Sequence, residues 1–288
     1  MKVKKRWIII FLFPATMLFS FVYLASIANV FGTSLMDWRI GLEMKFIGLG
    51  NYAFLLVSDK FQKALTNNII WIILQSTIHV AIGIIFALIT VHKRWYHRAS
   101  QTIFMLPNIL SSAALGMLFF NIFSPSFGPV NKIIQFFGNK NFNVNWYAHS
   151  GTAFFAVTMT WLPFAAVIGI LAAAEMAAIS DDVFEAAIID GASEFQMNWL
   201  IRLPMIKNAI GTGTILAATS MLQKMDILIM TSNGGPGHQT MNLPLLIYYT
   251  AMQDNNLGLA NAYGVLLVLI GLASIGIINK IYRMNEPV

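Results

Sequence analysis

Carboxylate side chains gather in one polar segment of this sequence, at about residues 175–208. The segment holds six of the twelve acidic residues of the chain, namely Glu175, Asp181, Asp182, Glu185, Asp190 and Glu194. Only Arg202 and Lys207 oppose them, although the chain as a whole has a formal net charge of +6. Carboxylates of this kind pair with arginine side chains of another protein. A membrane enzyme would need convergent carboxylates or histidines near one membrane face, and no histidine accompanies this cluster.

Capping signals divide the same segment into two short helices. Ser180 is an N-cap residue, and the following residues 182–189 continue as a helix with small alanines on it. Gly191 allows a sharp turn, and residues 194–201 predict a second helix that ends at Pro204. The segment is therefore predicted to be a hook, either a docking surface for another protein or a solvated acidic connection.

The elements that carry this hook must lie in a membrane. The chain of 288 residues is 57% hydrophobic and 10% charged, whereas soluble domains have about 25% charged residues. Because a helix crosses the bilayer in about 20 apolar residues, we expect one all-α membrane domain over residues 1–288. Its six predicted spans are residues 7–30, 69–91, 102–123, 151–174, 209–230 and 260–281. Pro14, Pro107 and Pro163 lie inside three of them and predict kinks or backbone exposed to a cavity.

The distribution of Lys and Arg sets the expected orientation. With the N-terminus in the cytoplasm, eleven of these residues fall on the inside and six on the outside, so both termini are predicted to be cytoplasmic. The start of the chain also resembles a secretory signal, but its apolar run of about 24 residues is longer than the usual 7–15, which favours a retained span. Residues 31–68 and 124–150 then form outer loops. In the second loop, residues 130–137 predict an amphipathic helix on the membrane surface.

Motifs for several other chemistries are missing from the sequence. It has no cysteine, no G-x-x-x-x-G-K-[ST] phosphate loop and no H-E-x-x-H pair, so no ATP site and no metal site are expected in this chain. His92 and His97, five residues apart beside Lys93 and Arg94, indicate a loop that sets topology rather than a metal site. We therefore expect no cofactor in this chain and no enzymatic activity of its own.

Four ordered blocks resemble the permease subunits of ABC importers. Glu185-Ala186-Ala187-Ile188-Ile189-Asp190-Gly191-Ala192, followed by Leu203-Pro204, is similar to their EAA loop. The other blocks resemble the carbohydrate-uptake branch, the maltose-type and glycerol-phosphate-type permeases. These blocks are Phe-Ile-Gly-Leu-Gly-Asn-Tyr at 46–52, Thr-Ser-Asn-Gly-Gly-Pro-Gly at 231–237 and Gly-Leu-Ala-Asn-Ala at 258–262. Where that branch often has a tryptophan near the end of the third span, this chain has Phe119 or Phe120.

The resemblance implies a type I ABC-importer permease fold and a larger machine in a bacterial cell membrane. Its partners would be a second homologous permease subunit, two ATPase subunits that bind ATP and Mg²⁺, and an extracellular solute-binding protein. The hook would be the coupling loop, with its ATPase-docking residues at Glu185, Ala186, Ala187, Asp190 and Gly191. Transport would proceed by alternating access around a site near the membrane midplane.

Polar side chains at membrane depth are the candidates for the substrate pathway. Besides the six residues selected at the end of this paragraph, these candidates are Gln75, His79, Asn108, Ser111, Ser112, Thr158, Thr219 and Asp226. In the resembling family the fourth and fifth spans line the substrate cavity, and sugars are bound by hydrogen-bonding groups and aromatic faces. The resemblance therefore selects Thr160, Trp161, Phe164, Ser220, Gln223 and Lys224.

The substrate expected from the resemblance is a sugar or oligosaccharide. A neutral saccharide is favoured, because an anionic substrate would need Arg or Lys at membrane depth and only Lys224 offers such a charge. Two alternatives stay open. One is an anionic substrate such as glycerol phosphate or a uronate oligosaccharide, and the other is a stand-alone secondary transporter.

Overall fold

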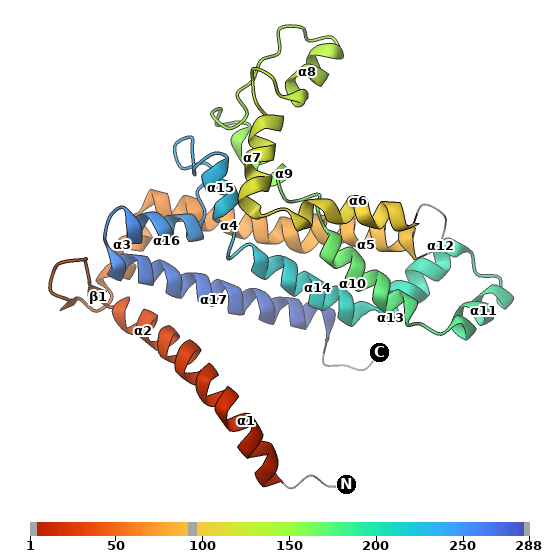
Figure 1. The fold of residues 1–288 in the computed structure, drawn as a ribbon, viewed down its shortest axis with the longest axis horizontal. Coiled ribbons are helices and arrows are strands. Elements are labelled where there is room, and N and C mark those ends of the chain that lie inside the picture. The colour runs from red at the N-terminus through yellow and green to blue at the C-terminus, as the bar shows by residue number, and fades with distance from the viewer. Residues whose placement is uncertain (1–4, 92–96, 285–288) are drawn as a thin grey trace. The chain divides into compact units, whose positions relative to one another are not determined.

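The computed structural model describes residues 5–91 and 97–284, and these residues are mostly helical (Figure 1). They belong to two compact units of the chain. Unit 1 comprises Met1–Phe61 and Leu246–Val268, and unit 2 comprises Gln62–Leu245 and Leu269–Val288. The candidate functional residues selected from the sequence all fall in unit 2, so unit 1 is described first and briefly.

Unit 1 contains one long N-terminal helix, a short strand pair, the short helix α3 and parts of three further helices. In chain order its elements are α1 (Lys5–Phe19), η1 (Ser20–Leu24), α2 (Ala25–Thr33), β1 (Met36–Asp37), β2 (Lys45–Phe46), α3 (Gly50–Val57), the start of α4 (Asp59–Leu74), most of α16 (Leu243–Met252) and the first part of α17 (Leu257–Tyr282). The two strands pair antiparallel, with Met36 opposite Phe46. The hydrophobic window of the Phe11–Thr33 helix has none of its residues buried, as suits a lipid-facing segment.

Hydrogen bonds explain the block at residues 46–52. The buried Asn51 side chain donates to the backbone oxygens of Ser34 and Met36 at 2.8 and 2.9 Å. The Tyr52 hydroxyl lies 2.8 Å from the Ser34 hydroxyl. Because an asparagine amide supplies two donors to one turn, the block fixes the backbone that follows α2. Its role in this structure is to hold the turn between α2 and β1.

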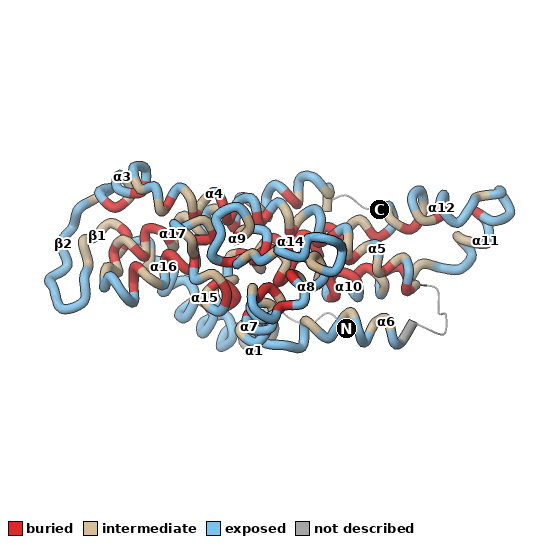
Figure 2. Tube along the Cα trace, turned by 90° about the horizontal axis from the view of Figure 1, so that it is seen from above, coloured by how far each residue is buried: buried red, intermediate tan, exposed pale blue. Residues whose placement is uncertain are grey.

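Unit 2 contains the remaining helices. In chain order they are the rest of α4, η2 (Gln75–His79), α5 (Val80–Thr90), α6 (His97–Ile109), α7 (Ser112–Ile122), α8 (Pro129–Phe136), α9 (Ala153–Met159), α10 (Ala166–Ala177), α11 (Asp181–Ile189), α12 (Glu194–Gln196), η3 (Met197–Arg202), α13 (Leu203–Met205), α14 (Lys207–Ser220), α15 (Asp226–Met230) and the ends of α16 and α17. Figure 2 shows exposed residues on α11 and α12 and buried residues on α5, α10 and α14.

The core of unit 2 lies where α5, α10 and α14 pack together. Its fully buried members include Ala87 on α5, Ile168 and Met176 on α10, and Ala217 on α14. Small residues alternate with branched ones in this cluster, which lets the helix backbones approach closely. The core therefore fixes α10 and α14, which have the hook at one end and line the polar cavity described below at the other.

Three unbroken helices are long and apolar enough to cross a membrane. Among the described residues these are Phe11–Thr33, Asp59–Thr90 and Leu257–Tyr282, which contain most of the first, second and sixth predicted spans. The second of them begins earlier than expected. Residues 59–68, predicted as part of an outer loop, form the first turns of α4. Asp59 in the first turn is favourable there because a negative charge complements the helix N-terminus.

The third, fourth and fifth predicted spans are each interrupted in the structure. The prolines predicted kinks in the third and fourth, whereas no break was predicted in the fifth. The third bends by 101° between Ile109 and Ser112. The fourth is interrupted between α9 and α10, and the fifth between α14 and α15. Pro107 and Pro163 account for two breaks, since proline removes a backbone donor and clashes with the preceding turn. At the first break the Ser111 hydroxyl accepts a hydrogen bond from the Ala114 amide at 3.2 Å, which caps the start of α7.

The second hook helix also differs from its prediction. It was expected to end at Pro204, but the helical path continues from Glu194 to Met205 through the wide turn η3 and α13. Proline has no backbone N–H and cannot make the hydrogen bond to residue i−4 of an α-helix. Because the π-turn η3 shifts the backbone pairing just before Pro204, Pro204 lies where that regular bond is already absent. The amphipathic helix predicted at residues 130–137 is confirmed as α8, where Ile133 and Phe136 are exposed. Its position on a membrane surface stays a prediction.

Gly258 provides a test of the packing in unit 1. A Cβ atom at this position would lie 2.1 Å from the Met36 backbone oxygen and 3.0 Å from the Trp38 backbone nitrogen. We expect Gly258→Ala to lower the free energy of unfolding by about 1–3 kcal/mol, the usual cost of overpacking. The matched control is Gly276→Ala in the same helix, where a Cβ atom meets nothing within 4 Å. In thermal unfolding of the purified proteins, Gly258→Ala should have a lower midpoint temperature than Gly276→Ala and the unchanged chain. Equal midpoint temperatures for the two variants would contradict this packing.

Candidate functional site

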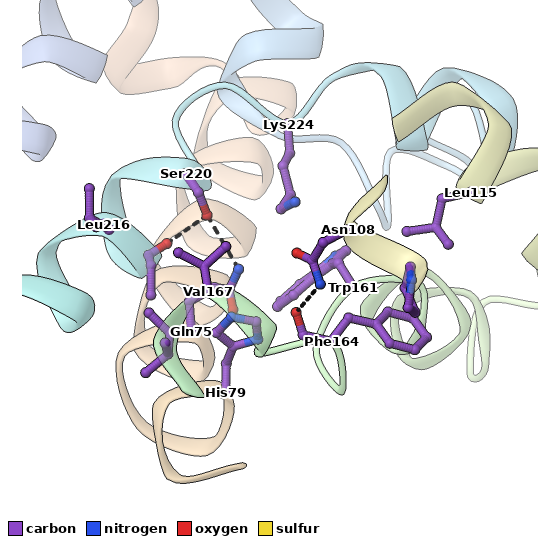
Figure 3. Close-up of a pocket in the computed structure, with 13 residues that line it drawn as sticks. Gln75, His79, Asn108, Leu115, Trp161, Phe164, Val167, Leu216, Ser220 and Lys224 are labelled. Atoms are coloured by element: carbon purple, nitrogen blue, oxygen red, sulfur yellow. Dashed lines mark hydrogen bonds between the residues drawn. The ribbon is translucent and has the colours of Figure 1, made fainter. Parts of the chain in front are cut away.

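A polar cavity of about 210 Å³ lies in unit 2, where broken and widened helices meet (Figure 3). Its polar lining comes from six side chains, namely Gln75, His79, Asn108, Trp161, Ser220 and Lys224. The remaining lining residues are apolar and include Phe164 and Leu216. Ligand sites typically combine such an apolar wall with a few placed polar groups.

The local structure of three elements explains why these side chains converge. Gln75 and His79 stand at the two ends of the wide turn η2, and both are buried. Trp161 and Phe164 lie in the interruption between α9 and α10, while Lys224 lies in the interruption between α14 and α15. Irregular backbone at membrane depth is tolerated where it lines a cavity or is buried in protein. The breaks in the fourth and fifth predicted spans are therefore positions that build the cavity, and the first of these breaks contains Pro163, where a kink or cavity-exposed backbone was predicted.

Side chains of the cavity also bond to the backbone at one of these breaks. His79 Nδ1 donates to the Leu162 oxygen at 2.8 Å, which places the ring proton on Nδ1 because a carbonyl oxygen only accepts. Asn108 Nδ2 donates to the Phe164 oxygen at 3.3 Å. The same residues that line the cavity thus satisfy carbonyl groups that a continuous helix would have paired.

Two hydrogen-bonding atoms in the cavity lining have no partner among the described residues. Gln75 donates from Nε2 to the Ser220 hydroxyl at 3.3 Å, but its buried Oε1 has no donor. The buried indole nitrogen of Trp161 has no acceptor, although Trp71 packs against its ring in an edge-on geometry at 6.3 Å. Buried polar atoms without a partner are costly, at about 1–3 kcal/mol each. One acceptor and one donor therefore remain for another group.

Lys224 brings a positive charge to this cavity. Its side chain is directed into the cavity in Figure 3. No acidic residue is among the described residues that line it, and Asp226, two positions along, is exposed. The Lys224 ammonium group therefore has no carboxylate partner among the described residues of the lining, and its own N–H groups can donate hydrogen bonds to a ligand.

The structure brings together four of the six pathway residues selected from the sequence. Trp161, Phe164, Ser220 and Lys224 line the cavity. Thr160 is buried and donates to the Val157 backbone oxygen at 2.6 Å, and Gln223 is exposed, so neither lines the cavity in this conformation. Sequence reasoning did not select Gln75, His79 and Asn108, although their polarity at membrane depth was the signal that could have found them.

A network of asparagine side chains fixes the backbone around Lys224. Asn242, which is fully buried, donates to the Lys224 backbone oxygen at 2.5 Å. Asn67 Nδ2 donates to the oxygens of Gln239 and Met241, and Asn68 accepts from the Leu243 amide at 2.9 Å. These bonds hold residues 239–243 and the Lys224 backbone in one arrangement, and within the network only Asn68 Nδ2 is buried without a partner among the described residues.

The hook has well-defined ends on both of its helices. After α11, the Gly191 amide donates to the Ile188 oxygen and the Ala192 amide to the Ala187 oxygen, which is the Schellman arrangement. Gly191 has a φ of +79°, as predicted from the need for a sharp turn. The next helix begins with a capping box between Ser193 and Gln196. The predicted helix–glycine–helix hook is therefore present.

Arg202 joins the two helices of the hook. It forms an ion pair with Glu194 and a hydrogen bond to Asn198, and its guanidinium lies 4.5 Å from the centre of the Phe184 ring on α11. The Arg202 side chain is 9% exposed, whereas that of Glu194 is 50% exposed. In the sequence, Arg202 counted only as a topology charge, so its role inside the hook was missed.

The predicted docking residues occupy both faces of the hook. Glu185, Ala186, Asp190 and Gly191 are exposed, whereas Ala187 is 8% exposed and packs within the chain itself. Large apolar side chains beside them are also open, including Ile189 at 84% exposed. Among the described residues no group of three or more potential ligands could hold a metal ion. His92 and the side chain of His97 lie outside the described residues.

Broken helices around a polar cavity, in a chain that also carries an exposed hook, are compatible with a membrane transport permease. The chain belongs to the family described as binding-protein-dependent transport system inner membrane component, which matches residues 79–286. This confirms the resemblance to ABC-importer permeases. The chain is accordingly a membrane component of a transport system.

Relatives with known names match most of the chain. The probable ABC transporter permease protein YurN of Bacillus subtilis is 29% identical over 92% of this chain and 91% of that protein. The sulfoquinovosyl glycerol transport system permease protein SmoG of Agrobacterium fabrum is 25% identical over 96% and 91%. The trehalose/maltose transport system permease protein MalF of Thermococcus litoralis is 29% identical over 76% and 74%.

Solved structures show the same fold. A chain of a bacterial alginate ABC transporter, in complex with an alginate pentasaccharide-bound periplasmic protein, aligns with a TM-score of 0.81 at 21% identity. The alignment covers 99% of this chain and 97% of that one. A chain of the inward-facing MetNI methionine ABC transporter aligns with a TM-score of 0.57 at 15% identity, over 83% and 99%. The chain therefore has the fold of an ABC-importer permease.

Arg202 supplies a test of the hook. We expect Arg202→Met to speed hydrogen exchange of backbone amides in residues 181–205. The opening free energy should fall by about 1–2 kcal/mol rather than the about 3–5 kcal/mol of a fully buried pair, because Glu194 is half exposed. Lys207→Met, which removes an equal charge next to the hook, should leave the exchange unchanged. Equal protection in both variants would show that Arg202 does not hold the hook together.

Proposed function

We propose that this chain is the transmembrane permease subunit of an ATP-driven, binding-protein-dependent importer of sugars or oligosaccharides. The observation that carries the proposal is the cavity at Trp161 and Lys224. It offers an unpaired donor, an unpaired acceptor and two aromatic side chains, which is the chemistry that a polyhydroxylated ring requires. The names of the relatives that transport trehalose, maltose or sulfoquinovosyl glycerol support the same substrate class.

The proposed machine contains this chain and a second homologous permease in one membrane, with six spans in this chain and both termini in the cytoplasm. Two ATPase subunits bind ATP and Mg²⁺ and carry out the hydrolysis, so this chain is not itself an enzyme and needs no cofactor. An extracellular solute-binding protein delivers the sugar. The alginate transporter, solved with its periplasmic protein, supports this kind of partner.

In this proposal the hook docks on an ATPase subunit. Glu185 faces an ATPase arginine, the exposed methyl group of Ala186 packs into the docking cleft, and Asp190 with Gly191 forms the turn. Ala187 contributes from inside by packing the base of the hook. When ATP closes the ATPase dimer, the hooks approach one another and the permease changes from inward-open to outward-open. The rigid caps and the Arg202 contacts support the hook as a lever that transmits this motion.

Two alternatives were left open by the sequence. An anionic substrate, such as glycerol phosphate or a uronate oligosaccharide, has Lys224 as its support, but the comparisons as a whole do not favour it. A stand-alone secondary transporter is not favoured either, because the chain belongs to a family of binding-protein-dependent components. We therefore assign Lys224 to hydrogen bonds with hydroxyl groups of a sugar.

The role of the turn at Gly191 in coupling can be tested by adding one methyl group, as in Gly191→Ala. Gly191 has a φ of +79°, so Gly191→Ala strains the turn by about 1–2 kcal/mol. We expect ATP hydrolysis by the assembled transporter to continue while sugar uptake falls, with membrane insertion unchanged. Glu185→Gln removes the charge without changing the shape of the side chain. It should likewise lower sugar uptake while ATP hydrolysis continues.

Gly138→Ala is the matched control for the hook, since Gly138 has a φ of +120° but lies beyond α8. It should behave as the unchanged chain in both assays. Normal uptake by Gly191→Ala and Glu185→Gln would remove the assignment of the hook to ATPase docking.

The cavity is tested by uptake of ¹⁴C-labelled trehalose, maltotriose, raffinose and arabinotriose into vesicles that contain the assembled transporter. Lys224→Met should lower uptake of the transported sugar about tenfold, because one charge-assisted hydrogen bond is lost. Lys280→Met, at an exposed position near the end of α17, should not change uptake. Absence of ATP-dependent uptake of any neutral sugar by the unchanged chain would contradict the proposed function. Unchanged uptake by Lys224→Met would show that Lys224 does not contribute to sugar binding.

A further inference from the structure

A second cavity in unit 2, of about 400 Å³, has no role in the function described so far. Its walls include Phe120 and Phe123 at the end of α7, Asn145 and Tyr147 before α9, and Ser232 after α15. The volume lies within the range of about 300–1,000 Å³ that is usual for ligand sites. The first cavity, on the breaks between helices, has a different lining.

One wall of the second cavity is an aromatic platform. The Phe120 side chain is 50% exposed, and its ring stacks on the buried Tyr147 ring with centroids 5.8 Å apart and an angle of 14°. Phe123 holds Tyr147 from the side, with its ring edge-on at 5.8 Å. Tyr147 is thus fixed and supports Phe120, which keeps one surface open. Open aromatic faces cover the apolar side of sugar rings in proteins.

The rest of the lining is largely polar and carries no charge among its described residues. It includes Ser124, Asn145 and Ser232, whose side chains have hydroxyl or amide groups, together with Gly235 and Pro236. Thr240 fixes part of this lining, because its hydroxyl lies 2.7 Å from the Ser232 hydroxyl and donates to the Gly235 oxygen at 2.8 Å. Uncharged donors and acceptors in the same cavity as an aromatic face suit a ligand rich in hydroxyl groups better than an ion or an apolar molecule.

A buried polar atom at this cavity also lacks a partner. The Tyr147 side chain is 6% exposed, and its hydroxyl group has no hydrogen-bond partner among the described residues. Burial raises the pKa of Tyr147, so the hydroxyl stays protonated and remains a donor. An unpaired buried hydroxyl is unfavourable, so a ligand acceptor that reached it would gain this bond.

Aromatic contacts join the two cavities along α7. Phe164, which lines the first cavity, meets Phe119 at 5.7 Å, and Phe119 meets Phe123 at 6.2 Å. Phe123 then contacts Tyr147 in the wall of the second cavity. Packed aromatic side chains therefore link the walls of the two cavities, with the buried Phe123 in the middle.

We propose that the second cavity is a separate saccharide-binding site, in which a sugar ring lies on Phe120 and its hydroxyl groups bond to Asn145, Ser124 and Ser232. This inference rests on the proposed function, since it gives the transported sugar a second position in the same chain. In the predicted topology the loops at residues 124–150 and 231–237 face outward, so the site holds the sugar before it reaches the Trp161 and Lys224 cavity.

The test uses the assembled transporter in lipid nanodiscs and the ¹⁴C-labelled sugars named above. Sugar binding is measured without the binding protein, by equilibrium dialysis, and uptake is measured with increasing sugar-loaded binding protein. Phe120→Leu keeps apolar volume but removes the aromatic face, and should weaken sugar binding about three- to tenfold, the range expected for one aromatic contact. Asn145→Ala should act in the same direction. Phe127→Leu is the matched control, since Phe127 is 58% exposed near the same loop but does not line the cavity.

The outcomes separate this site from the proposed function. Weaker sugar binding by Phe120→Leu, with an unchanged requirement for the binding protein, supports the site. Unchanged sugar binding by Phe120→Leu and Asn145→Ala overturns it while uptake by the unchanged chain still upholds the proposed function. A change in the concentration of binding protein needed for half-maximal uptake, with unchanged sugar binding, also overturns the site, because the cavity then contacts the binding protein instead of the sugar. If the unchanged chain transports no sugar, the proposed function and this inference fail together.

Discussion

A backbone group in a lipid bilayer must find a hydrogen-bond partner inside the protein, and the cavity of this permease follows from that constraint. Pro163 and the polar residues around Lys224 interrupt two helices, and each interruption frees carbonyl groups. His79 and Asn108 bond to the carbonyl oxygens at the first break, and Asn242 bonds to the carbonyl oxygen of Lys224. The residues that repair the breaks are the residues that enclose or flank the cavity, so structure and binding chemistry share one set of side chains.

The sequence could predict much of this arrangement and missed the rest for identifiable reasons. Apolar length alone located the unbroken helices, and Ser180, Gly191 and Pro204 predicted the hook. The breaks were different, because prolines predicted kinks but not where the chain would resume its helix. The wide turn at Gln75–His79 carries no local signal, since its residues are also acceptable in an α-helix. Gln75 and His79 therefore became part of the site only once the fold brought that turn beside Ser220 and Leu162.

Charge in the hook has two roles that the sequence does not separate. Counted along the chain, Arg202 is one more basic residue on the expected cytoplasmic side, and Glu194 is one more carboxylate. In the structure these two residues pair with each other, and Arg202 also covers the Phe184 ring. The remaining carboxylates at Asp181, Asp182, Glu185 and Asp190 are exposed. The acidic surplus is thus concentrated on the outer face of the hook, while its interior is held by one buried guanidinium.

The asparagine network connects residues 239–243 to the first cavity. Asn67 and Asn68 on α4 bind residues 239–243, and Asn242 within that stretch binds the backbone of Lys224. Each of these amides is buried, so breaking one bond leaves a polar group unpaired and costs about 1–3 kcal/mol. A displacement of residues 239–243 is therefore opposed unless Lys224 moves with them. The loop at 231–237 that borders the second cavity is tied to the same stretch through Thr240, so a continuous series of hydrogen bonds joins that loop to the backbone of Lys224 in the first cavity.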